Sequence, residues 1–188
     1  MTTVAVIVGS LRKDSLNLQF AKALAKLARP KLDLKILEIG DLPFYNQDLE
    51  QNLPAAVVRF KSELEAADAV LFITPEFLRS IPAALKNAIE WGARPYGKNS
   101  WGGKPGAVAG VTPGAIGTAV AQSHLRSIAP ILDVALISQP ELYVSLKPGQ
   151  IAENGDIADE ALKGLLQTFV ERFAAWIARL EQKPALKF

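Results

Sequence analysis

Apolar runs alternate with amphipathic stretches along the chain, and this alternation predicts strands and helices in turn. The first run, Val4–Val8, is continuously apolar and ends at Gly9, as expected of a strand buried on both faces. After a short polar turn, apolar residues recur every three or four positions, which predicts a helix. These residues are Leu16, Phe20, Leu24 and Leu27. The chain therefore opens with a strand, a turn and a helix.

Four more strand patterns follow, and helical patterns separate them. The predicted strands are 31–39, 69–74, 107–111 and 134–138, the last of them extended by 139–143. The predicted helices are 54–66, beginning at Pro54, 80–91, capped by Ser80, a helix from the turn at 112–117 to about 132, and 159–180. The inner side of the last helix is predicted from Leu162, Leu165, Leu166, Phe169, Phe173, Trp176 and Leu180.

Five strands that alternate with five helices predict an α/β fold. Because crossovers between parallel strands are right-handed, the helices should cover both faces of one five-stranded parallel sheet. In such a sheet with strand order 2-1-3-4-5, ligands bind beyond the carboxyl ends of the strands, between the first and third. The turns at 10–17, 75–80 and 112–117 would converge there.

Two irregular segments interrupt this pattern. Segment 40–48 contains Phe44 and Tyr45, which either pack against the protein or form the wall of a site or interface. Segment 92–106 contains Trp101 and is the longest irregular insertion before a strand. Loops of that length are usually lids, binding loops or interfaces.

The composition limits the possible chemistry. The chain has no cysteine and one histidine, His124, which excludes thiol nucleophiles, disulfides and cysteine- or histidine-rich metal sites. Any redox chemistry must therefore come from a cofactor. The formal net charge is +2 and the basic residues are interspersed with acidic ones, so nucleic acid is not indicated as a partner.

Length and hydrophobicity indicate the class of protein. A chain of 188 residues with 49% hydrophobic content fits a single compact domain, 1–188. No apolar run approaches the roughly 20 residues of a membrane span, and the first residues lack a signal-peptide pattern. We therefore expect no membrane insertion and a cytoplasmic location.

The turn after the first strand has the composition of an anion site. Ser10, Ser15 and Asn17 can donate side-chain hydrogen bonds. Arg12 adds a forked cation, and the helix start offers free N–H groups with a partial positive charge. The P-loop pattern is absent and Gly9 is the only glycine of this turn, so one terminal phosphate fits better than a triphosphate or a buried pyrophosphate. Alternatively, a serine only caps the helix and Arg12 is solvated.

Five motifs together indicate a family. They are Gly9–Asn17, Pro75–Phe77 with Arg79–Pro82, Leu85–Trp91, Pro113–Gly117, and His124–Arg126 followed by Gln139–Glu141. In this order they make the chain resemble the flavodoxin-like NADPH-dependent FMN reductase family, most closely its quinone and chromate reductase branch. The resemblance covers nearly the whole chain. It implies a flavodoxin-like three-layer sandwich.

The resemblance also implies a site for FMN. The residues that would hold its phosphate are Ser10, Arg12, Ser15, Leu16 and Asn17. The residues that would border its isoalloxazine ring are Pro75, Glu76, Phe77 and Leu78 on one turn, and Thr112 and Gly114 on another. Backbone N–H groups of the 75–78 turn could bond the pyrimidine edge of the ring and stabilise negative charge there.

The implied reaction is a two-step shuttle. NADPH or NADH passes a hydride to FMN and leaves, and an acceptor then takes two electrons. The acceptor would be a quinone or, alternatively, chromate, ferric iron or another soluble acceptor. No catalytic side chain and no protein-bound metal are required. Glu76 could act as a general base, but a carboxylate without a partner in such a turn favours a supporting role.

The chain departs from the family at the turn beside the ring. Phe77 and Leu78 stand where the family usually has Tyr and then Asn. A hydroxyl and an amide are therefore missing, and Leu78 adds an apolar surface on the expected substrate side. The acceptor, or the reaction itself, is left open by this change. Leu78→Asn is expected to alter acceptor selectivity more than FMN affinity.

Several charged residues have two interpretations. Arg79 and Arg94 either meet dinucleotide phosphates or an anionic acceptor, or are surface charges. His124 is expected to be structural or interfacial. Arg126 and Glu141 match positions that the family uses at subunit contacts, so their partners are expected across the interface of a homodimer or homotetramer.

Two other classes of protein stay open. A flavodoxin-type electron carrier would bind FMN without oxidising NAD(P)H, but such carriers are usually strongly acidic, unlike this chain. A response-regulator-like domain would need acidic residues at strand ends to hold a divalent ion, and neither Gly9 nor Thr74 has an adjacent Asp.

Overall fold

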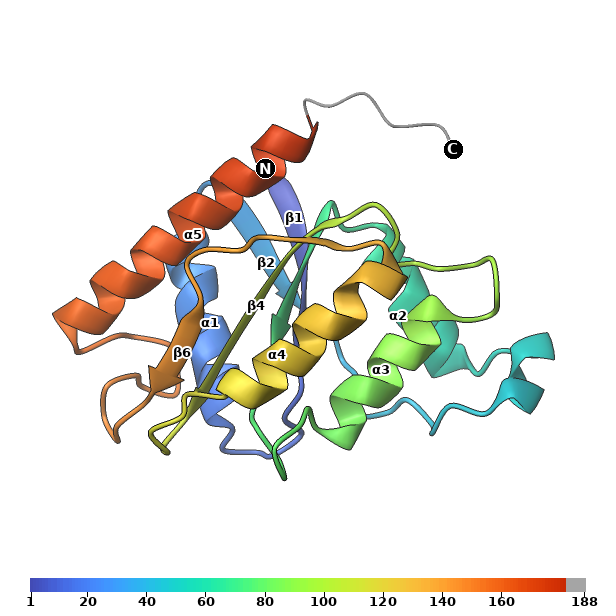
Figure 1. Cartoon of the computed structure of the whole chain (residues 1–188), viewed down its shortest axis with the longest axis horizontal. Coiled ribbons are helices and arrows are strands. Elements are labelled where there is room, and N and C mark those ends of the chain that lie inside the picture. Colours follow the sequence, from blue (N-terminus) through green and yellow to red (C-terminus); the bar gives the residue numbers. More distant parts are fainter. Residues whose placement is uncertain (182–188) are drawn as a thin grey trace.

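A computed structural model describes residues 1–181 of the chain. The strands in this range form one sheet in which every paired strand is parallel to its neighbour (Figure 1). They are β1 (Thr2–Val8), β2 (Leu32–Ile36), β3 (Ala69–Ile73), β4 (Pro105–Thr112), β5 (Ala135–Leu136) and β6 (Leu142–Ser145). The order β2-β1-β3-β4-β5 confirms the predicted sheet.

Helices cover both faces of the sheet. They are α1 (Leu16–Ala28), α2 (Ala55–Glu65), α3 (Ala83–Ala93), α4 (Ala119–Ile128) and α5 (Glu160–Glu181), with short 3-10 helices η1 (Gln47–Gln51) and η2 (Ala129–Leu132). One core holds α1 and α5 against the sheet, and a second core holds α2, α3 and α4 against the opposite face. The predicted three-layer α/β architecture is therefore confirmed. None of the helices between residues 1 and 181 has the length and hydropathy needed to cross a bilayer.

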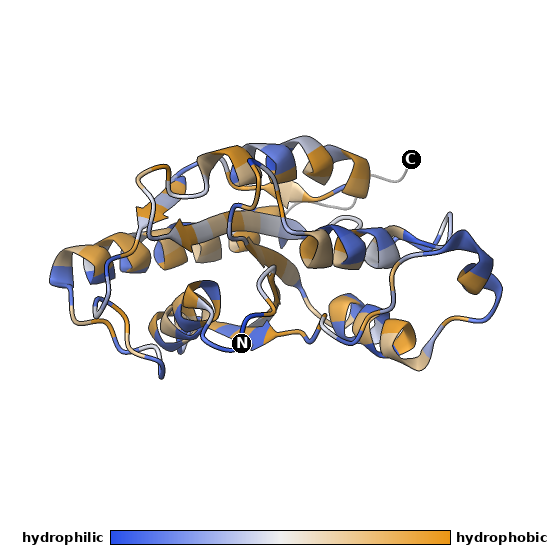
Figure 2. Ribbon diagram, turned by 90° about the horizontal axis from the view of Figure 1, so that it is seen from below, coloured by the Kyte–Doolittle hydropathy of each residue, from blue (hydrophilic) through white to orange (hydrophobic). Residues whose placement is uncertain are grey.

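Each central strand contributes to both cores, because successive side chains point to opposite faces. In β1, Val4 and Val6 belong to the core with α1 and α5, whereas Ala5 and Ile7 belong to the other. All residues of β3 are buried. In Figure 2 the strands are mostly coloured as hydrophobic, while the helices carry both colours. This two-sided burial explains the continuous apolar runs of the sequence.

The fifth predicted strand is in fact two strands, so the predicted extension through 143 is wrong. The first, β5, pairs with the start of β4, whereas β6 pairs with the end of β4. Between them lies Pro140, whose ring nitrogen cannot donate to a strand ladder. The shift places β6 beside the end of β4 that leads into the 112–117 turn.

Two predictions about helices are also wrong. Ser80 does not cap α3, which begins after Pro82 without a side-chain cap. The backbone of Ser80 pairs with Phe77 instead. Leu165 on α5 is 43% exposed, because it lies at the border of the buried stripe. That stripe consists of Leu162, Leu166, Phe169, Val170, Phe173 and Ile177.

The long insertion between α3 and β4 is fixed by the core. Trp101 is completely buried, and its Nε1 donates to the Ile89 carbonyl at 3.1 Å. A Cβ on Gly92 would collide with this indole. Lys61 Nζ donates to the carbonyls of Gly92 and Lys98 at 3.2 and 2.8 Å, and burial lowers the pKa of this ammonium. These contacts favour a structural role for the insertion over that of a lid.

Candidate active site

The three turns singled out in the sequence lie at one end of the sheet. They follow β1, β3 and β4, which are neighbours, and the carboxyl ends of parallel strands share one edge. This edge is at the bottom of Figure 1. The predicted convergence of the turns is therefore confirmed.

The first turn ends at the amino end of α1. Ser15 is the N-cap residue, because its buried Oγ accepts a hydrogen bond from the Leu18 N–H at 3.2 Å. The N–H groups of Leu16 and Asn17 have no acceptor within residues 1–181, and they carry the positive end of the helix dipole. Capping by Ser15 is thus compatible with anion binding at the same helix start.

The Asn17 side chain joins this helix to β4. Its Nδ2 donates to the Val111 carbonyl at 3.0 Å, and its Oδ1 accepts from the Val111 N–H at 3.1 Å. The side chain is only 4% exposed. Its amide therefore holds the first and third turns together, which leaves the backbone N–H of Asn17 as the group that could meet a phosphate.

The outer part of the first turn is open to solvent. Arg12 is exposed, and none of the ion pairs found within residues 1–181 includes it. Ser10 and Leu16 are half-buried beside it. A small cavity of about 170 Å³ adjoins Ser15 and Lys22. The guanidinium is therefore available to an anion at the start of α1.

The second turn is a tight hairpin that sequence reasoning missed. The backbone N–H and carbonyl groups of Phe77 and Ser80 exchange two hydrogen bonds of 3.0 Å. Between them, Leu78 and Arg79 have φ angles of +49° and +65°, as in a type I′ turn. Such turns usually carry Asn-Gly, a signature that Leu-Arg lacks. Leu78 is completely exposed at the tip, and Phe77 is 56% exposed.

Glu76 contacts the amino end of α4. Its Oε2 accepts hydrogen bonds from the N–H groups of Val120 and Ala121 at 3.0 and 3.2 Å. The local N-cap residue, Thr118, has φ +66° and makes no side-chain cap bond. The carboxylate therefore caps a helix that has no local cap, which agrees with the predicted supporting role and argues against a general base.

The third turn follows β4. The Gly114 N–H donates to Thr112 Oγ1 at 3.2 Å, which closes the start of the turn. Thr112 is half-buried, whereas Gly114 is exposed. A flat ligand between this turn and the 75–80 turn would therefore meet the threonine side chain and exposed backbone.

Arg94 is engaged away from the turns. Its Nε lies 2.6 Å from Glu50 Oε1 and 3.0 Å from the Tyr45 hydroxyl, which itself donates to Glu50 at 2.6 Å. The bond from Tyr45, followed by the bond from Arg94, lowers the pKa of Glu50. Tyr45 also packs on Trp91 with ring centroids 5.1 Å apart, whereas Phe44 is 81% exposed. The ion pair favours a structural role for Arg94 over dinucleotide binding.

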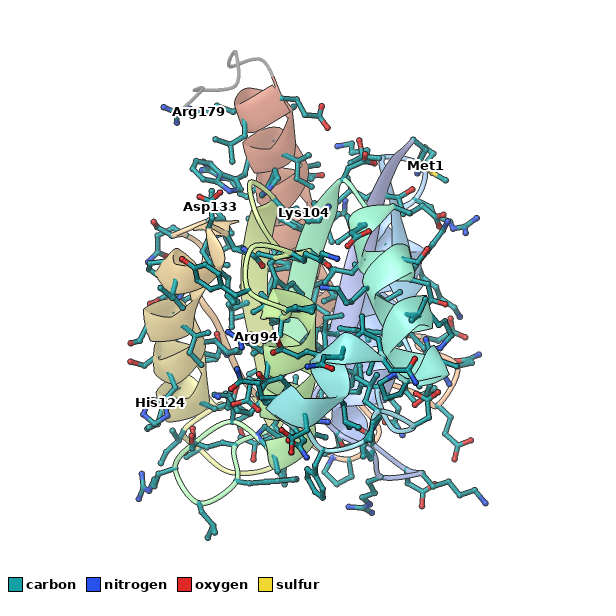
Figure 3. The ribbon with its side chains drawn as sticks, turned by 90° about the vertical axis from the view of Figure 1, so that its right-hand side faces the viewer. Met1, Arg94, Lys104, His124, Asp133 and Arg179 are labelled. Carbon is teal, nitrogen blue, oxygen red and sulfur yellow. The ribbon has the colours of Figure 1, made fainter. Side chains whose placement is uncertain are left out.

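Arg126 and Glu141 lie beside each other within the chain, and the expectation that they also contact a second subunit stays a prediction. The Arg126 Nε lies 3.4 Å from Glu141 Oε1, and its Nη1 donates to the Ile137 carbonyl at 3.0 Å. His124 Nδ1 lies 2.9 Å from Ser80 Oγ, so it touches the second turn. Figure 3 shows His124 on α4 toward the end of the molecule where the turns lie.

A groove of about 690 Å³ runs between β2 and α2, lined by Lys35, Leu37 and Arg59 among others. It lies at the edge of the sheet and borders none of the three turns. Size alone is therefore a poor guide to the site here, since the convergent polar groups lie elsewhere.

The geometry of the three turns fits FMN. A helix start with free N–H groups beside an arginine suits a phosphate monoester, and exposed apolar and backbone groups on the two neighbouring turns suit a planar ring. Phe77 N–H is occupied by Ser80, and Pro75 has no N–H. The backbone donors left to the ring edge are therefore those of Glu76, Leu78 and Arg79.

Comparison with known proteins points to the same cofactor. Residues 2–149 match the family described as NADPH-dependent FMN reductase. The chain is 48% identical over 174 residues to a 2-hydroxy-1,4-benzoquinone reductase of Burkholderia sp, covering 93% of this chain and 95% of that protein. It is 48% identical over 176 residues to a quinone reductase of Pseudomonas putida, covering 93% and 94%.

A solved structure supports both fold and family. FerB, a flavoenzyme NAD(P)H:(acceptor) oxidoreductase from Paracoccus denitrificans, matches with a TM-score of 0.92 and 49% identity, covering 95% of this chain and 98% of that one. The fold, the convergent turns and these similarities agree. The chain belongs to the NADPH-dependent FMN reductase family, and it is an oxidoreductase that uses FMN and NAD(P)H.

Proposed function

We propose that the protein reduces quinones by two electrons at the expense of NAD(P)H. The observation that carries this proposal is the convergence of an anion-ready helix start, an exposed apolar hairpin and the end of β4 at one edge of the sheet. The quinone reductases among the relatives support the class of acceptor. Chromate, ferric iron and other soluble acceptors remain further candidates.

FMN bound here would accept a hydride from NAD(P)H and return two electrons to the acceptor, in a ping-pong sequence. With one proton from water, NAD(P)H and quinone become NAD(P)⁺ and hydroquinone. The chain's part is to bind and orient: Ser10, Arg12, Ser15 and the N–H groups of Leu16 and Asn17 hold the phosphate. The free N–H groups of the hairpin would bond to the pyrimidine edge of the ring and stabilise negative charge there. No side chain acts as a nucleophile.

The apolar tip of the hairpin sets the substrate side. Leu78 is completely exposed, and Phe77 is half-exposed beside it. Flat apolar quinones suit such a surface better than strongly hydrated anions. This favours quinones over chromate as acceptors.

Anaerobic titration tests the proposal. The purified protein is expected to bind FMN, lose its yellow absorbance on addition of NADPH, and regain it when benzoquinone is added. FMN binding without bleaching would instead favour the flavodoxin-type carrier. Failure to bind FMN at saturating concentration would overturn the proposed site.

A homodimer or homotetramer is also proposed. A groove of about 530 Å³ between α3 and α4 is lined by Ile81, Ala83 and Ile128 among others, and Ile131 nearby is 84% exposed. Apolar surface of this kind favours contact with another subunit. Light scattering coupled to gel filtration is expected to give a mass above 20.3 kDa. The predicted cytoplasmic location is tested by cell fractionation.

A further inference from the structure

Helix α4 makes hydrogen bonds to the residues at both ends of the 77–80 hairpin. Before the hairpin, the Glu76 carboxylate bonds to the N–H groups of Val120 and Ala121. After it, Ser80 Oγ lies 2.9 Å from Nδ1 of His124, one helical turn further along α4. Both flanks of the hairpin are therefore attached to the same short stretch of one helix.

The hairpin needs external support. Leu78 and Arg79 both have positive φ angles, which side chains other than Gly, Asn and Asp adopt at a cost. Burial of the Leu78 side chain does not offset this cost, because the residue is completely exposed. Backbone conformations of this kind persist when the surrounding structure holds them in place. Within residues 1–181, the side-chain hydrogen bonds that join residues 76–80 to the rest of the protein are those of Glu76 with α4 and of Ser80 with His124.

We propose that Glu76 and His124 are positioning residues that hold the 77–80 hairpin in its flavin-binding shape. This inference rests on the proposed function, because the hairpin matters to catalysis only if it borders FMN. Glu76 supplies a charge-assisted bond to the helix start, and His124 fixes the exit of the hairpin through Ser80. Helix α4 thereby sets the orientation of the hairpin N–H groups that would bond to FMN.

A merely structural role makes a different prediction. If Glu76 only capped α4, its loss would lower the stability of the fold without changing the hairpin. If His124 only filled surface space, leucine would replace it without effect. The distinguishing quantity is therefore the local opening of the hairpin, read from hydrogen exchange of the Phe77 and Ser80 amides in the protein without FMN.

Five variants of the full-length protein test the proposal. Glu76→Ala and His124→Leu remove the two bonds. Glu76→Gln and His124→Asn keep an acceptor or donor near the same place and serve as conservative rescues. Ser123→Ala changes an exposed residue beside His124 on α4 and is the matched control.

In Glu76→Ala and His124→Leu, exchange of the Phe77 and Ser80 amides is expected to accelerate about tenfold and fivefold, respectively. Exchange of the β3 amides should stay unchanged. The dissociation constant for FMN, read from flavin fluorescence, should rise by similar factors. The kcat for benzoquinone should fall even at saturating FMN, with the two conservative variants and Ser123→Ala close to the wild type.

Unchanged exchange of the hairpin amides in both variants would overturn the proposal. Faster exchange with unchanged FMN affinity and kcat would also overturn it, because the hairpin would then not need positioning. If the wild-type protein failed to bind FMN, the proposed function would fail, whereas the exchange measurement would still report whether α4 holds the hairpin.

Discussion

The turns at 10–17 and 75–80 face the same candidate ligand but are built differently. The first takes its shape from the start of α1, where Ser15 caps the helix and the next N–H groups stay free. The second contains two left-handed residues and is held by a helix more than forty positions away in the sequence. An anion site can thus form from local geometry, whereas the wall for the ring depends on remote contacts.

The largest effect on stability is expected at Asn17, whose side chain joins the first turn to β4. Asn17→Ala leaves both backbone groups of Val111 without their buried partner, which should lower the free energy of unfolding by roughly 2–3 kcal/mol. Urea denaturation measures this change. Lys13→Ala, an exposed change in the same turn, should have little effect. Equal stability of the two variants would mean that α1 is held to β4 by packing alone.

A second variant tests the anion site without touching the fold. Arg12→Ala should weaken FMN binding about tenfold, because one charge-assisted bond is lost from the phosphate, while the midpoint of urea unfolding stays unchanged. Fluorescence titration of FMN gives the comparison. Lys13→Ala is again the control, since it alters the charge equally. If both variants weakened binding to the same extent, Arg12 would act through net charge and not through contact.

In the second turn, substitution of Leu78 should increase the stability of the protein. Leu78→Asn is expected to raise the free energy of unfolding by about 0.5–1 kcal/mol, because asparagine tolerates the left-handed region better than leucine. It should also change the ratio of kcat/KM values between apolar quinones and anionic acceptors more than it changes FMN affinity. Steady-state kinetics with the two acceptor classes would show this. An unaltered ratio would remove Leu78 from the substrate side.

The smallest effect concerns a remote contact that borders neither turn, the Tyr45–Glu50–Arg94 cluster. The pKa of Glu50 in the folded protein lies below its ordinary value of 4.5. Its contribution to stability is therefore present above pH 4.5 and is lost as the pH falls through the folded pKa. Glu50→Gln should lower the thermal midpoint at neutral pH, and its difference from the wild type should shrink in acid. A constant difference would rule out the carboxylate as the cause.

The fold was predictable because burial leaves a strong pattern. The central strands are apolar on both faces, and the helices show their periodicity clearly, so the alternating elements could be predicted, whereas the strand order was implied by the resemblance to the flavodoxin-like family. The division between β5 and β6 was not foreseen, since Pro140 interrupts the ladder inside an otherwise extended stretch. Leu165 was wrongly assigned to the buried side of α5. Its position fits the helical period, but it lies at the border of the buried stripe and is partly exposed.

The site was predictable in part. The helix start after β1 is marked by serines and an arginine close together in sequence. The hairpin was not recognisable, because Leu78 and Arg79 lack the usual turn residues. The partners of Glu76 and His124 were equally hidden, since each bond joins segments that only the packing of α4 brings together. Local chemistry is readable from sequence, whereas contacts between distant segments are not.

The fit of Gly92 beneath Trp101 also constrains how this sequence can vary. Because the indole fills the volume that a side chain at position 92 would need, a larger residue at position 92 requires a smaller one at position 101. With Trp101 in place, a larger residue at position 92 would displace its ring from its contacts with Phe60 and Phe72. Covariation between these two sites is thus the evolutionary trace that this contact should leave.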